Sequence, residues 1–287
     1  MANIHPSAVV SPLAELGPGV EIGPFCVVEA GTVIGEGCRL EARACVKEGT
    51  LLGKFNVVGE ASVIGGRAQH VHNGPIGGKL IIGDHNNIRE FSTMHRAFKP
   101  EDSTLVGSHN MFMVGAHVAH DCVVGDYVIV VNNALLGGHV TVGDRAFISG
   151  GVAIHQFCRV GTCAMVGGHT KIVKDVPPYT TVDGSPAALI GLNKVGIRRA
   201  GYSAEDLLQL KHAYRLIYRR GLRWTEVLEA LTTEFTTGPA AAFREFFLEC
   251  KRGFTPERRV SRGATLKLVN GDDSHETGQD DHSIEAA

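Results

Sequence analysis

Large apolar residues recur at every sixth position of this 287-residue chain. Stepping by six from Ile4 to Ile172, only His70 and Pro100 of the 29 positions are not large and apolar. Glycine often follows the apolar residue, and a small residue stands two positions before the next one. This pattern is typical of a six-residue β-helix repeat. It predicts a parallel β-helix in which three repeats form one triangular coil, so that residues 18 apart stack at about 4.8 Å.

Two stretches depart from the repeat pattern, although the six-residue register is the same before and after them. Residues 66–79 and 97–104 are polar or rich in glycine and proline. Insertions in a solenoid loop out on one face, which is often the binding face. We therefore expect both stretches to project beside the functional site.

The six-residue rhythm stops after Pro178, and helical spacing replaces it. Ser203 with Asp206 three residues later is a capping box that begins the first predicted helix, and Gly221 closes it. Helices are predicted over 203–220, 225–235 and 238–254. The expected fold is mainly β, with three parts: a catalytic β-helix domain over 1–180, a linker and C-terminal α-helical domain over 181–254, and a polar, disordered tail over 255–287.

Composition narrows the class of protein. Glycine, at 36 residues, is in excess, which fits a chain of many tight turns. A formal net charge of -2 argues against a nucleic-acid binder that relies on bulk positive charge. No stretch has the apolar length of a membrane span, and the first residues lack an export signal, so we expect a cytoplasmic protein without membrane insertion. The seven scattered cysteines predict no disulfides.

Histidines gather in the middle coils. Five of the 14 lie there: His117, His120, His139, His155 and His169. Counted with an 18-residue period, three of them fall along one edge of the prism with Asp121 and Gln156. Such a stripe of imidazoles fits a metal site, a general base with supporting groups, or turn residues that bond their neighbours. The spacing leaves these alternatives open.

Five short segments resemble a known family of enzymes. They are GAHVAHDC (115–122), NNALLGGHV (132–140), HQF (155–157), DVPPY (175–179) and RLIYR (215–219). With the hexapeptide prism, they closely resemble the acyl-carrier-protein-dependent UDP-N-acetylglucosamine O-acyltransferases that begin lipid A biosynthesis. The similarity extends over about residues 4–250. Hexapeptide prisms occur in many acetyltransferases, so the order of the histidine segments is the specific part.

The resemblance implies a left-handed prism, a homotrimer with active sites between neighbouring chains, and no cofactor or metal. It implies transfer of a 3-hydroxyacyl chain from acyl carrier protein, the co-substrate, to the 3-hydroxyl of UDP-N-acetylglucosamine. His120 would be the general base, Asp121 would orient it, and the amide of Gly138 would hold the oxyanion. A sugar hydroxyl needs a base with a pKa of about 6.5, and a thioester carbonyl needs a donor for its developing charge. No covalent enzyme intermediate is required.

The resemblance also assigns residues that bind the substrates. Four residues would line the sugar and acyl clefts, namely His117, His139, His155 and Gln156. Gly168 would set the depth of the acyl cleft. In GLNKVGIRRAG (191–201), Asn193 and Arg199 would contact the UDP portion, and Arg199 suits a phosphate by its charge and fork geometry.

The first insertion departs from the family pattern. Relatives commonly carry an acidic residue and a lysine two positions apart beside the acceptor sugar, whereas this chain has QHVH at 69–72. His70 and His72 would therefore be the acceptor contacts. Val195 and Ala200 stand where some members have an acid and an arginine. Because the acceptor contacts differ, another UDP-amino sugar is the alternative acceptor.

A stripe of basic residues lies along the first predicted helix. Lys211, Arg215 and Arg219 recur at four-residue spacing in a nearly neutral chain. Such a stripe suits an acidic partner such as acyl carrier protein, through electrostatic steering. A solvated helix face would give the same pattern, and the resemblance favours the partner.

Other functions remain open. The later N-acyltransferase of the same pathway normally places a uridine-binding domain before its prism, whereas here the repeats begin at Ile4. A coenzyme-A-dependent acetyltransferase, a metal-dependent hydratase on the same prism and a scaffold without activity are further alternatives. Stoichiometric zinc that is lost together with activity in His120→Ala or His139→Ala would favour the hydratase.

Overall fold

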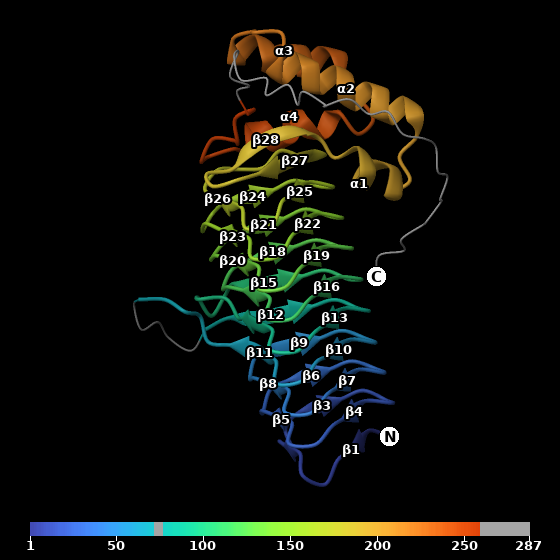
Figure 1. The fold of residues 1–287 in the computed structure, drawn as a ribbon. Helices are drawn as coiled ribbons and strands as arrows, with labels where there is room; N and C mark the ends of the chain where they lie inside the picture. The colour runs from blue at the N-terminus through green and yellow to red at the C-terminus, as the bar shows by residue number, and fades with distance from the viewer. Residues whose placement is uncertain (72–76, 259–287) are drawn as a thin grey trace, which may run out of the picture.

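The computed structural model describes residues 1–71 and 77–258. Within them the chain winds through 28 short strands and four helices (Figure 1). Successive coils add one parallel strand to each of three sheets, which form the sides of a triangular prism, and a final antiparallel strand ends one of the sheets. The predicted parallel β-helix is therefore confirmed.

Within each sheet, neighbouring coils contribute neighbouring strands. Sheet A consists of β1 (Asn3–Ile4), β4 (Glu21–Ile22), β7 (Arg39–Leu40), β10 (Val57–Val58), β13 (Asn87–Ile88), β16 (Met111–Phe112), β19 (Ile129–Val130), β22 (Phe147–Ile148), β25 (Met165–Val166), β27 (Thr180–Asp183) and β28 (Ala188–Leu192). Sheet B consists of β2 (Val9–Val10), β5 (Val27–Val28), β8 (Cys45–Val46), β11 (Val63–Gly66), β14 (Thr93–His95), β17 (His117–Val118), β20 (Leu135–Leu136), β23 (Ala153–Ile154) and β26 (Lys171–Ile172). Sheet C consists of β3 (Glu15–Leu16), β6 (Val33–Ile34), β9 (Thr50–Leu52), β12 (Lys79–Ile82), β15 (Ser103–Val106), β18 (Val123–Val124), β21 (Thr141–Val142) and β24 (Arg159–Val160).

The sixth-position residues form the core of the prism. In sheet B, for example, Val118, Leu136 and Ile154 stack in register 18 residues apart, and all three are buried. The first coil is the exception, because no coil lies below it. Ile4 is therefore 42% exposed although it begins the repeat.

The small positions of the repeat also point inward, and some of them carry polar side chains. Asn56, Asn86 and Asn110 stand above one another in consecutive coils of sheet A and are buried. The side-chain oxygen of Asn56 accepts a hydrogen bond from the Asn86 amide at 2.8 Å, and that of Asn86 accepts one from the Asn110 amide at 2.9 Å. The ladder pairs most of these buried polar groups, which the apolar pattern does not reveal, and leaves Asn110 Nδ2 without a partner within the described residues.

The corners of the prism require left-handed backbone. Asp121, His139 and Phe157 occupy one corner in consecutive coils, with φ of 60°, 59° and 66°. A residue with a Cβ pays a steric cost there, which the repeated strand pairing on both sides overcomes. The rings of His139 and Phe157 stack with centroids 4.5 Å apart. The fold thus places side chains of successive coils directly above one another at this edge.

Four helices cover the last coils of the prism (Figure 1). They are α1 (Lys194–Arg199), α2 (Ala204–Tyr218), α3 (Trp224–Glu234) and α4 (Ala241–Leu248). The predicted capping box is confirmed, since the Ser203 side chain accepts from the Asp206 amide and the Asp206 carboxylate accepts from the Ser203 amide. A second core of apolar side chains joins the helices to the prism, where Tyr179 packs against Phe243.

The helix ends differ from the sequence-based expectation. The first helix ends at Tyr218, two residues before the predicted end, and α1 was not expected. α4 ends at Leu248, although the apolar spacing continues to Phe254. The chain turns back there because residues after α4 pair with the prism, as in the 2.9 Å bond from the Asp175 amide to the Gly253 carbonyl. Prism-like pairing also continues past residue 180, because β27 joins β25 in sheet A.

Thr255 is buried and bonds to Asp175. Residues 255–258, the first four of the predicted tail, therefore belong to the described structure, and the rest of the tail, 259–287, lies outside the described residues. All seven cysteines are free thiols. In the described ranges no helix has the length and apolar character needed to cross a bilayer.

Candidate active site

Both insertions reach one corner of the prism. The first leaves the prism between β11 and β12 (Figure 1), and the second connects β14 to β15. The Phe98 amide in the second insertion donates to Asp121 Oδ2 at 3.2 Å. The His70 ring of the first insertion lies on the Phe98 ring, with centroids 4.4 Å apart, and meets the His120 ring edge-on at 5.8 Å.

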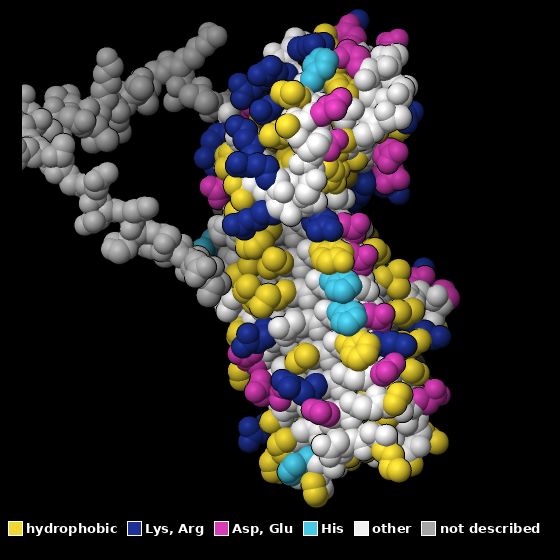
Figure 2. Space-filling view, turned by 90° about the vertical axis from the view of Figure 1, so that its right-hand side faces the viewer, with side chains coloured by type: hydrophobic (Ala, Val, Ile, Leu, Met, Phe, Trp, Pro, Cys, Tyr) yellow, Lys and Arg dark blue, Asp and Glu magenta, His cyan; other side chains and the backbone are white. Residues whose placement is uncertain are grey.

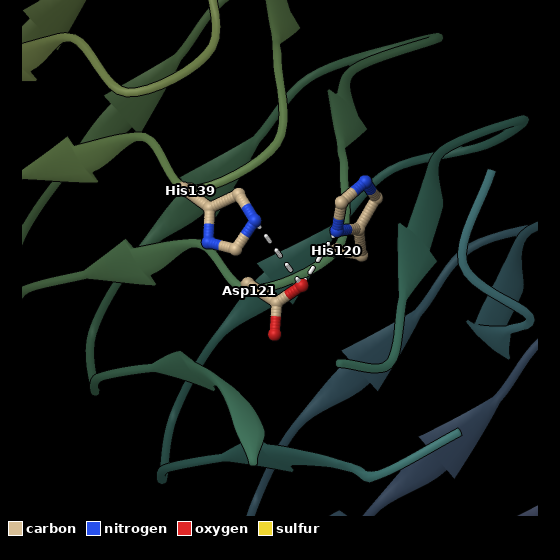
Figure 3. Close-up of side chains that lie close together, drawn as sticks. All are labelled: His120, Asp121 and His139. Carbon is tan, nitrogen blue, oxygen red and sulfur yellow. Dashed lines mark hydrogen bonds and ion pairs between the residues drawn. The ribbon is translucent and has the colours of Figure 1, made fainter. Parts of the chain in front are cut away.

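His120 and Asp121 form a buried pair at this corner (Figure 3). His120 Nδ1 lies 2.5 Å from Asp121 Oδ2, and each side chain is only 9% exposed. The Asp121 amide donates to Thr104 Oγ1 at 2.8 Å, which fixes the backbone that carries the carboxylate. Neighbouring residues of one chain thus present an imidazole that a carboxylate holds in place.

The pairing determines which nitrogen of His120 can act as a base. A carboxylate only accepts hydrogen bonds, so the 2.5 Å contact places the proton of neutral His120 on Nδ1. Nε2 is then left with a free lone pair. A base of this kind can take a proton from a hydroxyl group placed against that edge of the ring.

Gly138 lies against the Nε2 edge of His120. A Cβ built on Gly138 would be 2.9 Å from His120 Nε2 and 2.9 Å from Cε1, so no larger residue fits without moving the ring. Within the described residues the Gly138 amide has no hydrogen-bond acceptor. Pro18 and Pro24 occupy the same place in other repeats, so the fold does not use this N–H. Gly138 and the His120 imidazole therefore lie side by side.

His139 completes a cluster around Asp121. Its Nε2 is 3.7 Å from Asp121 Oδ2, and its ring meets the His120 ring edge-on at 5.3 Å (Figure 3). Burial lowers the pKa of His139, and the nearby Asp121 opposes this effect only in part. His139 therefore favours the neutral state, in which it can donate and accept.

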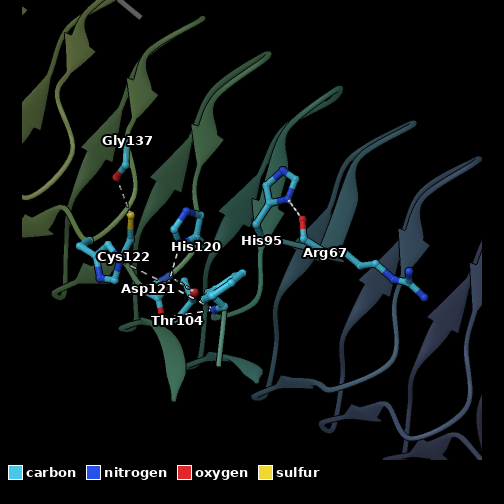
Figure 4. A network of polar contacts seen from close by, with 9 residues as sticks. Arg67, His95, Thr104, His120, Asp121, Cys122 and Gly137 are labelled. Atoms are coloured by element: carbon cyan, nitrogen blue, oxygen red, sulfur yellow. Dashed lines mark hydrogen bonds and ion pairs between the residues drawn. The ribbon is translucent and has the colours of Figure 1, made fainter. Parts of the chain in front are cut away.

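His117 lies on the adjoining strand, β17. Its Nδ1 is 2.8 Å from Thr93 Oγ1, and its ring lies 5.1 Å from that of His95. Burial lowers the pKa of His117 to about 4 and lowers that of His95 as well. His95 Nδ1 is 2.6 Å from the Arg67 carbonyl of the first insertion (Figure 4). The imidazoles of His117 and His95 beside the cluster thus favour the neutral state at neutral pH.

We expect His117 to make a contribution to the free energy of unfolding that is lost at acid pH. The neutral form is favoured in the folded state, so His117 stabilises the fold above about pH 6.5, and this contribution is lost as the pH falls toward 4. We expect His117→Gln to show a shallower fall in Tm between pH 7 and 4 than the parent. Thermal unfolding across that range measures the difference. The matched control is His109→Gln, at an exposed position of another corner, and equal slopes in all three proteins would contradict the expectation.

The other predicted cleft residues lie near the same edge. His155 and Gln156 are exposed and lie one coil above His139, with His155 Nδ1 3.0 Å from the Gln156 carbonyl. Gly168 is exposed, and the nearest atom to a Cβ built there is the Gly150 carbonyl oxygen at 3.7 Å. A side chain at 168 would therefore be accommodated. His72 lies outside the described residues.

Asn193 and Arg199 lie on a different side of the prism. Asn193 caps α1, because its side-chain oxygen accepts from the Gly196 amide at 2.9 Å. Both residues line a hollow of about 420 Å³ between α1 and sheet A, together with Tyr127, Arg145 and other side chains. The Arg199 side chain has no ion-pair partner within the described ranges. A single chain therefore does not bring these two residues to the corner that holds His120.

The predicted basic stripe lines a second hollow. Lys211, Arg215 and Arg219 of α2 and its C-cap surround a space of about 330 Å³ together with Lys194 of α1. Figure 2 shows Lys and Arg side chains gathered on one side of the helical end. Arg219 is paired with Glu257 at 2.6 Å. The surface offers positive charge to an acidic partner.

Sequence reasoning missed three groups at the corner: His95, Phe98 and Thr104. His95 directly follows the sixth-position residue Met94, where an outward polar residue carries no signal. Phe98 and Thr104 belong to the second insertion, whose expected position beside the site was the only available clue. The contact of Phe98 with Asp121 and that of His95 with the Arg67 carbonyl depend on loop conformation, which has no period, whereas Thr104 lies in β15.

The cluster has the groups for acid–base chemistry and also the spacing of metal ligands. The ligand atoms of His120, Asp121 and His139 all lie within 4.8 Å of one another, which would suit a small cation. A thiol nucleophile is disfavoured at this corner. Cys122 is buried behind Asp121 with its Sγ 3.2 Å from the Gly137 carbonyl (Figure 4), and burial raises its pKa to about 12.

Comparison with known proteins gives consistent matches along the chain. Residues 175–255 match the family model described as UDP-N-acetylglucosamine O-acyltransferase, domain 2. Residues 13–48 match the model of the bacterial transferase hexapeptide repeat. The acyl-[acyl-carrier-protein]–UDP-N-acetylglucosamine O-acyltransferase of Ectopseudomonas mendocina is 45% identical over 179 residues, which cover 62% of this chain and 69% of that protein. The enzyme of the same name from Gloeothece citriformis is 42% identical over 176 residues, 61% of this chain and 64% of that one.

Solved structures agree with these matches. The UDP-N-acetylglucosamine O-acyltransferase of Moraxella catarrhalis superposes with a TM-score of 0.85 at 38% identity, over 88% of this chain and 99% of that chain. The UDP-N-acetylglucosamine acyltransferase of Arabidopsis gives a TM-score of 0.77 at 36% identity, with the same coverage. The predicted fold class, a left-handed parallel β-helix followed by helices, is thereby confirmed.

Proposed function

Because this chain belongs to the family of acyl-[acyl-carrier-protein]–UDP-N-acetylglucosamine O-acyltransferases, we propose that His120 is its general base for acyl transfer to a sugar hydroxyl. The enzyme catalyses the first step of lipid A biosynthesis. The acyl donor is acyl carrier protein, and the acceptor is the 3-hydroxyl of UDP-N-acetylglucosamine. The observation that carries the proposal is the 2.5 Å contact between His120 Nδ1 and Asp121, with Nε2 facing Gly138.

The reaction proceeds by direct attack. His120 Nε2 takes the proton of the 3-hydroxyl as that oxygen attacks the thioester carbonyl carbon. The Gly138 N–H donates to the oxyanion that forms, and Asp121 stabilises the imidazolium. The carbon–sulfur bond then breaks, and the leaving sulfur receives the proton from Nε2. Each bond change is completed without an acyl group on the protein.

The neutral imidazoles around the base bind the acceptor. His139 and His117, whose pKa values burial lowers, offer donors and acceptors to sugar hydroxyls without adding positive charge beside the base. Neutral neighbours avoid electrostatic repulsion of the imidazolium that forms on His120 during the reaction. His70 lies at the open side of the cluster, where the first insertion would contact the sugar.

The acyl cleft is proposed to end at Gly168. Because a side chain can be accommodated there, Gly168→Met should fill the cleft without unfolding the coil. We expect the preferred acyl chain to shorten by several carbons, while turnover of the short donor is retained. Relative kcat/KM for a series of acyl carrier protein thioesters measures the change. An unchanged preference would place the cleft elsewhere.

The active enzyme is proposed to be a homotrimer that shares its sites between chains. In support, Asn193 and Arg199 lie beside sheet A, whereas His120 follows β17 of sheet B. The hollow beside Arg199 includes the outward apolar side chains of Ile129 and Phe147, which suits burial against a second chain.

Shared sites predict complementation between two defective chains. His120→Ala and Arg199→Ala should each have low activity alone, but trimers that contain both would include sites with both residues intact. With random assembly from equal amounts, roughly one quarter of the sites are complete. Co-expression followed by an acyl-transfer assay measures the recovery. Co-expression of His120→Ala with Asp121→Ala is the control, and recovery there as well, or in neither pair, would contradict shared sites.

An acyl-transfer assay tests the proposed function. Purified protein is supplied with acyl carrier protein thioesters of several chain lengths and with either UDP-N-acetylglucosamine or its 3-amino analogue. We expect acylated product from the hydroxyl acceptor. Product from the amino analogue alone would favour the alternative of another UDP-amino sugar, which the QHVH segment suggests. No product from either acceptor would contradict the substrate assignment.

The metal-dependent hydratase remains the second candidate, because the cluster of His120, Asp121 and His139 has ligand spacing. Metal analysis of the purified protein separates the two. Activity that persists after chelation supports the acyltransferase mechanism. Stoichiometric zinc that disappears with activity in His139→Ala would support the hydratase.

A further inference from the structure

The described chain ends beside the basic hollow of the helical end. The Leu189 amide of β28 donates to the Pro256 carbonyl at 2.9 Å, and the Arg258 amide donates to the Leu189 carbonyl at 2.8 Å. Residues 256–258 thus run alongside β28, and the next residue of that strand, Ile190, lines the hollow. The described part of the chain therefore ends at the rim of this hollow.

An acidic side chain already occupies one part of the hollow's rim. Glu257 accepts hydrogen bonds from Arg219 Nη2 at 2.6 Å and from the Tyr214 hydroxyl at 2.6 Å. Three other cations around the same space, on Lys194, Lys211 and Arg215, have no ion-pair partner within residues 1–71 and 77–258. The hollow thus carries positive charge that Glu257 does not neutralise, next to a carboxylate from the chain's own C-terminal segment.

The residues that follow carry the complementary charge. From 271 to 287 the sequence contains no lysine or arginine and six acids, namely Asp272, Asp273, Glu276, Asp280, Asp281 and Glu285. Thirteen residues, 259–271, lie between Arg258 and the first of them. A polar chain of that length has a root-mean-square span of about 20 Å, which exceeds the distance across a hollow of this size. Tethering at such a length gives an effective concentration in the mM range.

We propose that the acidic segment 271–287 of this chain binds the hollow formed by Lys194, Lys211, Arg215 and Arg219, and competes there with the acidic acyl carrier protein. The competition rests on the proposed function, because it requires that the carrier docks on the same surface. Binding of the segment to the hollow does not depend on the proposed function. The segment acts as an internal competitor that weakens carrier docking at low carrier concentration and leaves the chemical step unchanged.

Binding is tested with a peptide of residues 269–287. The receptor is the full chain in which its own six acids are replaced, as Asp272→Asn, Asp273→Asn, Glu276→Gln, Asp280→Asn, Asp281→Asn and Glu285→Gln. We expect saturable binding by fluorescence anisotropy, weakened at least about fivefold between 50 and 200 mM salt. Adding Lys211→Glu and Arg215→Glu to the receptor should abolish it. The control carries the same charge change at the far end of the prism, Arg39→Glu and Lys54→Glu, and should bind as the receptor does.

Competition is tested by kinetics of the full chain with and without its six acids. We expect the variant to have a KM for acyl carrier protein about two- to tenfold lower, with kcat and the acceptor KM unchanged. No peptide binding, or equal binding to the Lys211→Glu and Arg215→Glu receptor, would overturn the proposal. Binding with an unchanged KM would overturn the competition. If the protein binds the peptide specifically but transfers no acyl chain, the proposed function is contradicted. The proposal that segment 271–287 binds the hollow is then still supported.

Discussion

His120→Ala is expected to lower kcat about a hundredfold to ten-thousandfold, the range that general-base assistance contributes. Without the imidazole, the sugar hydroxyl must lose its proton to water, while the Gly138 amide still binds the oxyanion. The loss should therefore be large but incomplete. Because the side chain is buried and bonded to Asp121, its removal leaves a cavity and takes a hydrogen-bond partner from the carboxylate, so Tm should fall by several degrees while the chain still folds. Steady-state acyl transfer and thermal unfolding measure the two effects.

Matched histidines serve as controls for this prediction. His109→Ala removes an exposed imidazole from another corner and should leave kcat unchanged. His139→Ala removes a ring that meets His120 edge-on and should raise the acceptor KM more than it lowers kcat. Near-normal kcat in His120→Ala would assign the base to another histidine, and an unfolded variant would assign His120 a structural role.

Gly138→Ala is expected to lower kcat about tenfold to a hundredfold although it adds a single methyl group. The new Cβ would lie 2.9 Å from His120 Nε2, so the ring must turn or shift. A displacement of about 1 Å at a reacting group can cost a hundredfold in rate. The amide that would hold the oxyanion moves with the same backbone. The measurement is kcat under saturating donor and acceptor, together with Tm.

Gly150→Ala is the appropriate control for the added methyl group. Gly150 occupies a comparable turn, and a Cβ there finds its nearest atom, the Asn132 carbonyl oxygen, at 3.4 Å, an ordinary contact. We expect Gly150→Ala to keep normal turnover. If both variants keep normal turnover, His120 tolerates displacement and the proposed alignment of base and donor is wrong.

The prism could be predicted from the sequence because its geometry has a fixed period. One apolar residue in six defines the inward position, and three repeats per coil then determine the register, as the stacking of Val118, Leu136 and Ile154 shows. The same count placed Asp121 and His139 at one corner, where the structure has them. Their separation of 18 residues, one full coil, was sufficient to predict that they lie above one another.

Other parts of the site follow no period and could not be predicted. Phe98 and His70 reach the cluster through insertions whose conformation depends on their own packing. The polar ladder that begins at Asn56 stands at positions where the pattern indicates only small size. Arg199 is far from His120 in the sequence, and in the single chain it lies on another side of the prism. The proposed trimer would bring Arg199 to the catalytic corner from a neighbouring chain.

Direct transfer by a histidine base is the central claim, and the mass of the protein during turnover tests it most directly. The enzyme is mixed with acyl carrier protein thioester and UDP-N-acetylglucosamine, quenched at successive times, and the intact masses of enzyme, carrier and sugar nucleotide are recorded. The account predicts acylated sugar and free carrier in equal amounts, with the enzyme mass unchanged throughout. An acyl group that appears on the enzyme before product and is then passed to the sugar at the rate of turnover would contradict it.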